Sequence, residues 1–123
     1  QFQSNASVLL FLPEGEHHEI GLLFIYYLLK SRGVKVWYLG TNVPLKDLNY
    51  VVGIKKPDVV YTHLTSVANN FNFERFLTTL SSKIPAQKVV ISGQLTQTFK
   101  KKMQDNIHFL GSLPEVMEYI STL

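Results

Sequence analysis

The stretch Ser7-Val-Leu-Leu-Phe-Leu12, followed by Pro13-Glu-Gly-Glu-His-His18, decides the fold. Its first six residues form a short, continuous apolar run, which is typical of a strand buried on both faces of a sheet. Pro13 and Gly15 end this run, and apolar side chains at helical spacing begin at Ile20. A buried strand that leads through a short polar loop into a helix is the first part of a βαβ unit, so we expect a parallel sheet.

The same order of strand and helix repeats along the chain. After the first helix, which a glycine at Gly33 ends, further strands are expected at 34–39, 59–64, 88–92 and 107–110, and further helices at 44–52, 73–80, 94–103 and 113–120, the third of these being weak. Strands that alternate with helices pair in parallel through right-handed crossovers. The sequence therefore predicts a flavodoxin-like (Rossmann-like), doubly wound α/β domain with five strands in the order 2-1-3-4-5.

Length and composition predict one domain over residues 1–123. Hydrophobic residues make up 46% of the chain, which is enough for a core, and there is no cysteine to form disulfides, thiolate metal sites or a thiol nucleophile. No apolar run approaches the roughly 20 residues that span a bilayer. The chain begins at Gln1 without a secretory signal, so we expect a cytoplasmic fragment of a longer protein.

The net charge of +3 does not by itself predict a nucleic-acid binder, because the charges are spread and only Lys100-Lys-Lys102 forms a run. This run is expected to be a solvated helix face, with a phosphate contact as the alternative.

A ligand crevice in such a sheet lies beyond the carboxyl ends of the strands, at the topological switch point. The loops to inspect are therefore 13–18, 65–70 and 93–96, which are rich in polar and turn residues. On their own they are compatible with FMN, a nucleotide, a phosphate, a metal or no ligand.

Ionisable groups are densest in the first of these loops. Imidazole binds transition metals, and a carboxylate at Glu16 could accept the other ring N–H of His18, which would fix the tautomer and raise the basicity of the ligand. The alternative is that Glu16 and Glu19 stabilise the start of the helix while both neighbouring histidines are exposed loop residues.

The string Glu16-x-His18-x-x-Gly21 resembles the Asp-x-His-x-x-Gly signature of cobalamin-binding domains. The wider segments 13–24, 32–33 and 38–48 are similar to the corrinoid domain at the carboxyl end of MerR-type transcriptional regulators. The resemblance implies that His18 displaces the dimethylbenzimidazole tail and becomes the lower axial ligand of cobalt. It also implies that Glu16 hydrogen-bonds His18 and that the tail threads between the sheet and its helices.

Two later segments depart from the family pattern. Thr62-His63-Leu64 is nearest to the family's Ser-x-Leu motif, with either Thr62 or His63 at the serine position and a buried core residue as the alternative. Gly93-Gln94 replaces a Gly-Gly pair that would let the backbone approach the tail. The residues expected at the cofactor are therefore Glu16, His18, Gly21, Thr62, His63, Thr65, Gly93 and Gln94, with His18 as the metal ligand.

Three functions are open. The preferred one is a non-enzymatic sensory module that binds cobalamin, with adenosylcobalamin as one form, in a regulator that contacts DNA through an upstream domain and forms a homo-oligomer. The alternatives are a corrinoid carrier of a methyltransferase or mutase, and an interaction domain that has lost the cofactor. The aromatic residues Tyr26, Tyr27 and Trp37 are expected in the core or an interface. Because this chain lacks the family's covering helical subdomain, we expect it to fold alone and bind cobalamin weakly or not at all.

Overall fold

A five-stranded parallel sheet forms the centre of the structure, a computed structural model that describes residues 4–65 and 71–123. The strand order is β2-β1-β3-β4-β5, and every neighbouring pair is parallel. The strands are β1 (Ser7–Pro13), β2 (Lys35–Val43), β3 (Val59–His63), β4 (Lys88–Ser92) and β5 (Ile107–Leu110). The helices are α1 (Ile20–Ser31), α2 (Leu45–Lys55), α3 (Phe73–Lys83) and α4 (Leu113–Ser121), and a 3-10 helix, η1, spans Gln94–Thr98. The predicted flavodoxin-like topology is confirmed.

β1 lies inside the sheet, which explains its unbroken apolar run. Leu9 pairs with Trp37 of β2 on one side and with Val60 of β3 on the other. Residues 8–12 are completely buried. A strand with neighbours on both edges and helices over both faces has no exposed position at which a polar side chain would be favoured.

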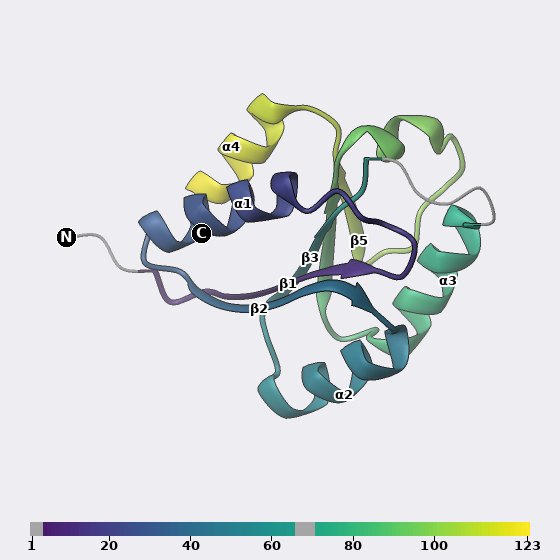
Figure 1. Ribbon diagram of the computed structural model, residues 1–123, viewed down its shortest axis with the longest axis horizontal. Helices are drawn as coiled ribbons and strands as arrows, with labels where there is room; N and C mark the ends of the chain where they lie inside the picture. Colours follow the sequence, from purple (N-terminus) through teal and green to yellow (C-terminus); the bar gives the residue numbers. More distant parts are fainter. Residues whose placement is uncertain (1–3, 66–70) are drawn as a thin grey trace.

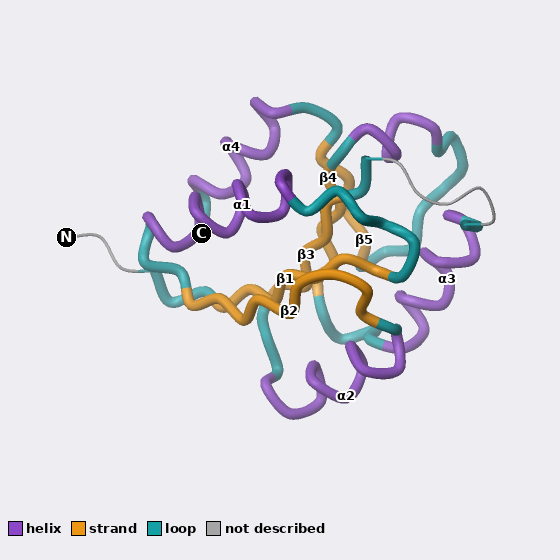
Figure 2. Tube along the Cα trace, in the orientation of Figure 1, coloured by secondary structure: helices purple, strands orange, loops and turns teal. Residues whose placement is uncertain are grey.

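Helices cover both faces of the sheet, with α1 and α4 over one and α2 and α3 over the other (Figure 1). Leu22, Ile25 and Val116 belong to the core on the first face, while Leu48 and Phe76 belong to the core on the second. The chain leaves β1 toward one face and leaves β3 toward the other, so the switch point lies between the carboxyl ends of these two strands (Figure 2). None of the described helices is long and apolar enough to cross a membrane.

Several sequence-based boundaries are wrong, and α2 and α3 each continue about one turn beyond the expected end. The helix expected at 94–103 is only the 3-10 helix η1, because the Thr96 and Thr98 hydroxyls donate to nearby carbonyls and compete with α-helical bonding. β2 continues past Leu39 to Val43 through an irregular segment with Gly40 at φ +84°, so this glycine lies within the strand. β3 ends at His63, one residue earlier than expected.

The exposure of several side chains narrows the expectations for them. Tyr26 packs edge-on against Tyr38, with ring centroids 5.2 Å apart, but Tyr27 is 68% exposed and does not belong to the core. Residues 100–102 are exposed, as expected, but do not lie on a helix. Lys101 of this run forms an exposed ion pair with Glu74 at 2.9 Å.

Candidate functional site

The carboxylate of Glu16 joins the loops that follow β1 and β3. It is completely buried. Its Oε2 accepts hydrogen bonds from the backbone N–H of His18, at 3.0 Å, and from the ring Nδ1 of His18, at 2.8 Å. Its Oε1 accepts from the backbone N–H of Thr65, at 2.8 Å. One side chain therefore spans the switch point and fixes the position of His18.

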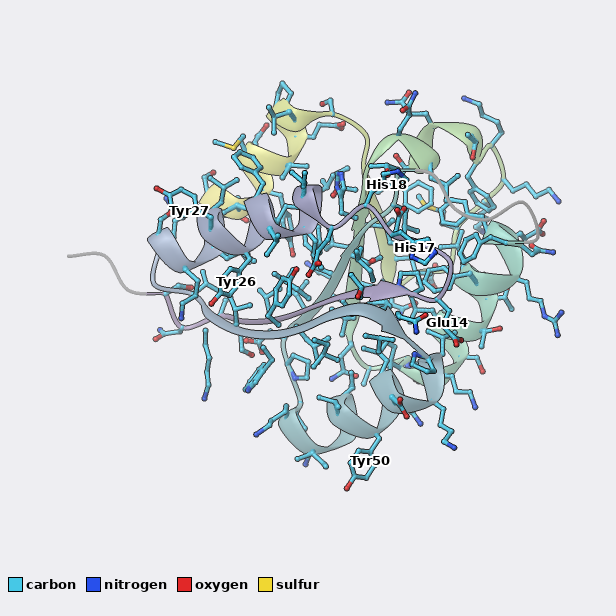
Figure 3. The ribbon with its side chains drawn as sticks, in the orientation of Figure 1. Glu14, His17, His18, Tyr26, Tyr27 and Tyr50 are labelled. Carbon is cyan, nitrogen blue, oxygen red and sulfur yellow. The ribbon has the colours of Figure 1, made fainter. Side chains whose placement is uncertain are left out.

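His18 is held in one tautomer by this contact. A carboxylate accepts hydrogen bonds, so Nδ1 of His18 carries a hydrogen in this contact, and Nε2 is the ring nitrogen that could ligate a metal. The His18 side chain is 62% exposed, on the loop between β1 and α1 (Figure 3). His17 is also exposed, but among the described residues Glu16 bonds to His18 and Thr65 and not to His17. A metal ion approaching this edge would be bound by Nε2 of His18.

A second histidine, His63, is held by a hydrogen bond between its Nδ1 and Ser92 of β4. Tyr61 donates its hydroxyl hydrogen to Ser92 Oγ at 2.9 Å, and Ser92 Oγ lies 2.7 Å from His63 Nδ1. A hydroxyl has one hydrogen and two lone pairs, so Ser92 can accept from Tyr61 and still either donate to Nδ1 of His63 or accept from it. Burial lowers the pKa of His63, and the negative charge of Glu16 partly opposes this shift. The His63 imidazole is therefore suited to the neutral form.

The His63 ring packs directly against Gly21, in the space that a side chain at position 21 would need. A Cβ added to Gly21 would lie 2.4 Å from His63 Cδ2 and 2.6 Å from Nε2. These distances are far below the usual carbon contact of roughly 3.5–4.0 Å. The glycine of the signature string thus lets the His63 imidazole lie directly against the first turn of α1.

A pocket of about 530 Å³ lies between α1, α4 and the carboxyl ends of the strands. Its size is within the usual range for small-molecule sites. Its lining includes apolar side chains of both helices and a few polar groups: Ile20, Phe24, Leu113, Val116, His63 and Gln94. Gln94 is exposed, so its side chain lies at the rim and does not fill the interior. The pocket has the character of a site for a partly apolar ligand.

The predicted register ambiguity between Thr62 and His63 has a structural answer. Thr62 is completely buried on the sheet face covered by α2 and α3, where Val60 and Leu64 also point, whereas His63 lines the pocket on the other face. The Thr62 hydroxyl has no hydrogen-bond partner among the described residues. The structure therefore places His63, and not Thr62, where a ligand in this pocket would meet it.

Gly93 is needed for a reason that differs from the expected one. Its φ is +107°, and an added Cβ would lie 2.3 Å from the carbonyl oxygen of Leu64. That carbonyl accepts from the backbone N–H of Leu95 at 3.0 Å. The glycine therefore lets the loops after β3 and β4 pack together, in addition to lining the pocket.

The predicted residues thus form two groups. Glu16, His18 and Thr65 lie at the switch point, and Gly21, His63, Gly93 and Gln94 lie at the pocket. The hydroxyl of Thr65 is buried without a partner among the described residues, and the rest of its loop, 66–70, lies outside them. No group of three or more potential metal-ligating side chains occurs in the described part of the chain. Sequence reasoning missed Ser92 and Tyr61, because only strand pairing brings them next to His63.

No protein-family model matches this chain. The chain is 38% identical over 78 residues to the HTH-type transcriptional repressor CarH of Myxococcus xanthus, an alignment that covers 63% of this chain and 26% of that protein. The chain thus aligns with about a quarter of the curated relative.

Solved structures confirm the fold. A cobalamin-binding protein from Desulfitobacterium hafniense DCB-2 superposes with a TM-score of 0.62 at 20% identity, over 95% of this chain and 50% of that one. The anti-anti-sigma factor PhyR from Bartonella quintana superposes with a TM-score of 0.61 at 13% identity, over 98% of this chain and 47% of that one. Taken together, the similarity to a transcriptional repressor and the shared fold with a cobalamin-binding protein support the predicted resemblance to a cobalamin-binding domain.

Proposed function

We propose that this chain is a cobalamin-binding regulatory domain in which Nε2 of His18 would be the lower axial ligand of cobalt. The observation that carries the proposal is the buried Glu16 carboxylate, which accepts from Nδ1 of the exposed His18 at 2.8 Å. Metal-ligating histidines usually donate their second ring N–H to a carboxylate or carbonyl, which orients the ring and raises its basicity. The similarity to a repressor and to a cobalamin-binding protein supports the same ligand class.

The residues at the switch point fit a corrinoid. A corrinoid would supply a cobalt ion with exchangeable axial ligands, and a single neutral imidazole is a suitable lower ligand. His18 needs no second protein ligand for this purpose, so the absence of a larger metal-ligating cluster among the described residues is compatible with it. The pocket between α1 and α4 provides an apolar space for the nucleotide tail.

Glu16 is a positioning residue in this account. Its three hydrogen bonds keep the loop after β1 against the loop after β3, so the His18 ring is oriented before any ligand arrives. Preorganisation lowers the entropic cost of forming a bond to the ligand. A glutamine at this position would keep the size of the side chain but would weaken the charge-assisted bond to Nδ1.

The regulatory setting is also part of the proposal. The curated relative is a helix-turn-helix repressor, and this chain spans about a quarter of its length. We therefore place the domain in a transcriptional regulator of the MerR type, which contacts DNA through another domain, forms a homo-oligomer and catalyses no reaction. A corrinoid carrier domain is the second candidate, and the similarity to a cobalamin-binding protein without a regulator's name favours it.

Binding can be tested by titrating the chain with hydroxocobalamin and following the cobalt-sensitive absorption bands. The His18→Ala variant should lose the spectral change that histidine ligation produces. The matched His17→Ala variant removes an exposed imidazole next to it and should keep this change. If neither this chain nor the full-length protein shows a spectral change at millimolar ligand, the proposed function is wrong. An equal loss in both variants would contradict the assignment of His18.

A further inference from the structure

The imidazole of His63 fills the slot between the end of β3 and the first turn of α1. It lies so close to Gly21 that even a methyl group there would meet Cδ2 at 2.4 Å and Nε2 at 2.6 Å. A second ring cannot fit between Gly21 and His63 in this arrangement, because ring atoms need contacts of roughly 3.5 Å or more. The slot is therefore closed by this chain's own side chain.

Hydrogen bonds hold the ring from the strand side. Nδ1 of His63 lies 2.7 Å from Ser92 Oγ, and Ser92 in turn accepts from the hydroxyl of Tyr61, a residue that is only 1% exposed. Burial lowers the pKa of His63, so the ring is neutral in this half-apolar slot. Rotating the ring out of the slot breaks the hydrogen bond between His63 and Ser92, which has to be replaced by another partner.

The slot is part of the pocket wall, at the first turn of α1, which closely follows the proposed cobalt ligand in the chain. One loop residue separates His18 from the start of α1, and Gly21 is in the first turn of that helix. Both Gly21 and His63 line the pocket. A group that a His18-bound ligand sends between the first turn of α1 and the sheet would meet these two residues. The pocket that they line is spacious, at about 530 Å³, so at this point the His63 ring and not the pocket volume limits the space.

We propose that His63 is a specificity-determining residue that makes this domain discriminate among corrinoids by their lower nucleotide. Corrinoids whose nucleotide does not enter the slot bind without disturbing His63, whereas a nucleotide that enters must displace the ring. The inference rests on the proposed function, because it takes His18 as the cobalt ligand.

The test compares hydroxocobalamin, which carries the nucleotide, with aquocobinamide, which lacks it. Both are titrated by absorbance into the wild-type chain and into the His63→Ala and His63→Ser variants. Either substitution should tighten cobalamin binding about tenfold, the change that 1.4 kcal/mol produces, and should leave cobinamide binding nearly unchanged. His108→Ala is the matched control, because His108 is an exposed histidine on β5, and it should alter neither affinity.

The outcomes separate this inference from the proposed function. If both corrinoids bind but the His63 variants bind cobalamin equally well or more weakly than wild type, the inference alone is overturned. If neither corrinoid binds to wild type or to the variants, in this chain or in the full-length protein, the inference and the proposed function both fail.

A second measurement does not depend on the stability of the variants. Nitrogen NMR of labelled histidines in the wild-type chain reports the His63–Ser92 bond directly. Cobalamin should shift the Nδ1 resonance of His63 and cobinamide should not. Equal shifts with both ligands would overturn the inference.

Discussion

Gly21→Ala gives the sharpest test of how the slot is packed. The added Cβ would meet the His63 ring at 2.4 Å and 2.6 Å, so the ring must retreat by about 1 Å to reach a normal contact. This movement strains or breaks the 2.7 Å bond to Ser92, whose net contribution is about 0.5–1.5 kcal/mol. Overpacking a filled site costs about 1–3 kcal/mol, and the better helix propensity of alanine returns up to about 1 kcal/mol. We expect a net loss of about 1 kcal/mol in wild type.

Gly21→Ala should change the free energy of unfolding in the opposite direction once the His63 ring is removed. In a His63→Ala background the added methyl group meets no ring, so Gly21→Ala should stabilise by up to about 1 kcal/mol. Urea denaturation of the two single variants and the double variant gives the coupling energy, expected at about 1–3 kcal/mol. Gly53→Ala in α2 is the control, because an added Cβ there meets nothing within 4 Å and should stabilise equally in both backgrounds. A coupling energy within measurement error of zero would refute the close packing of Gly21 and His63.

Three further predictions concern stability and binding. Gly93→Ala should lower the free energy of unfolding by at least about 2 kcal/mol, because the φ of Gly93 is +107° and an added Cβ would clash with the backbone of Leu64. Adding His63→Ala should not restore this stability, since the clash is with backbone; restored stability would contradict the reasoning. Burial lowers the pKa of His63 in the folded chain, whereas in the unfolded chain the histidine keeps its ordinary pKa of about 6.5. Near and below that pH the unfolded chain therefore binds more protons than the folded chain, so the free energy of unfolding should fall as the pH drops through about 6.5. Urea midpoints measured from pH 8 to pH 5 report this fall, and the midpoint of the His63→Ala variant should fall less steeply than that of wild type. The same pH dependence in both proteins would contradict the role of His63. The chain alone should give the circular dichroism spectrum of an α/β fold but should bind hydroxocobalamin weakly. The upper face of the corrinoid ring would stay in water, and each Å² of apolar surface left unburied loses about 25 cal/mol of binding free energy. Submicromolar binding would show that no covering subdomain is needed.

Local patterns carried most of the fold. The unbroken apolar run of β1, the turn residues after it and the helical spacing of α1 are all contiguous in sequence, and they predict a central buried strand at once. The bond between Glu16 and His18 was predictable for the same reason, because two residues of separation limit how the side chains can meet.

Contacts between distant segments could not be predicted in this way. His63 meets Ser92 only because β3 and β4 pair in that register, and it meets Gly21 only because α1 packs over that edge of the sheet. The sequence left Thr62 and His63 as equal candidates, since the face on which each lies depends on the strand register. The helix expected after Gly93 failed because threonine side chains there bond to the local backbone.

The central claim is that Nε2 of His18 is the lower ligand of cobalt, and electron paramagnetic resonance of the cobalt(II) form tests it most directly. Cobalamin is added to chain in which all histidine nitrogens are ¹⁵N, and the cobalt is reduced to its paramagnetic state. Histidine ligation predicts that each cobalt hyperfine line splits into a doublet from one ¹⁵N nucleus. His17→Ala should keep the doublet and His18→Ala should lose it. A triplet from ¹⁴N in the labelled wild-type protein would mean that the ligand's own dimethylbenzimidazole still binds cobalt, and it would contradict the assignment of His18.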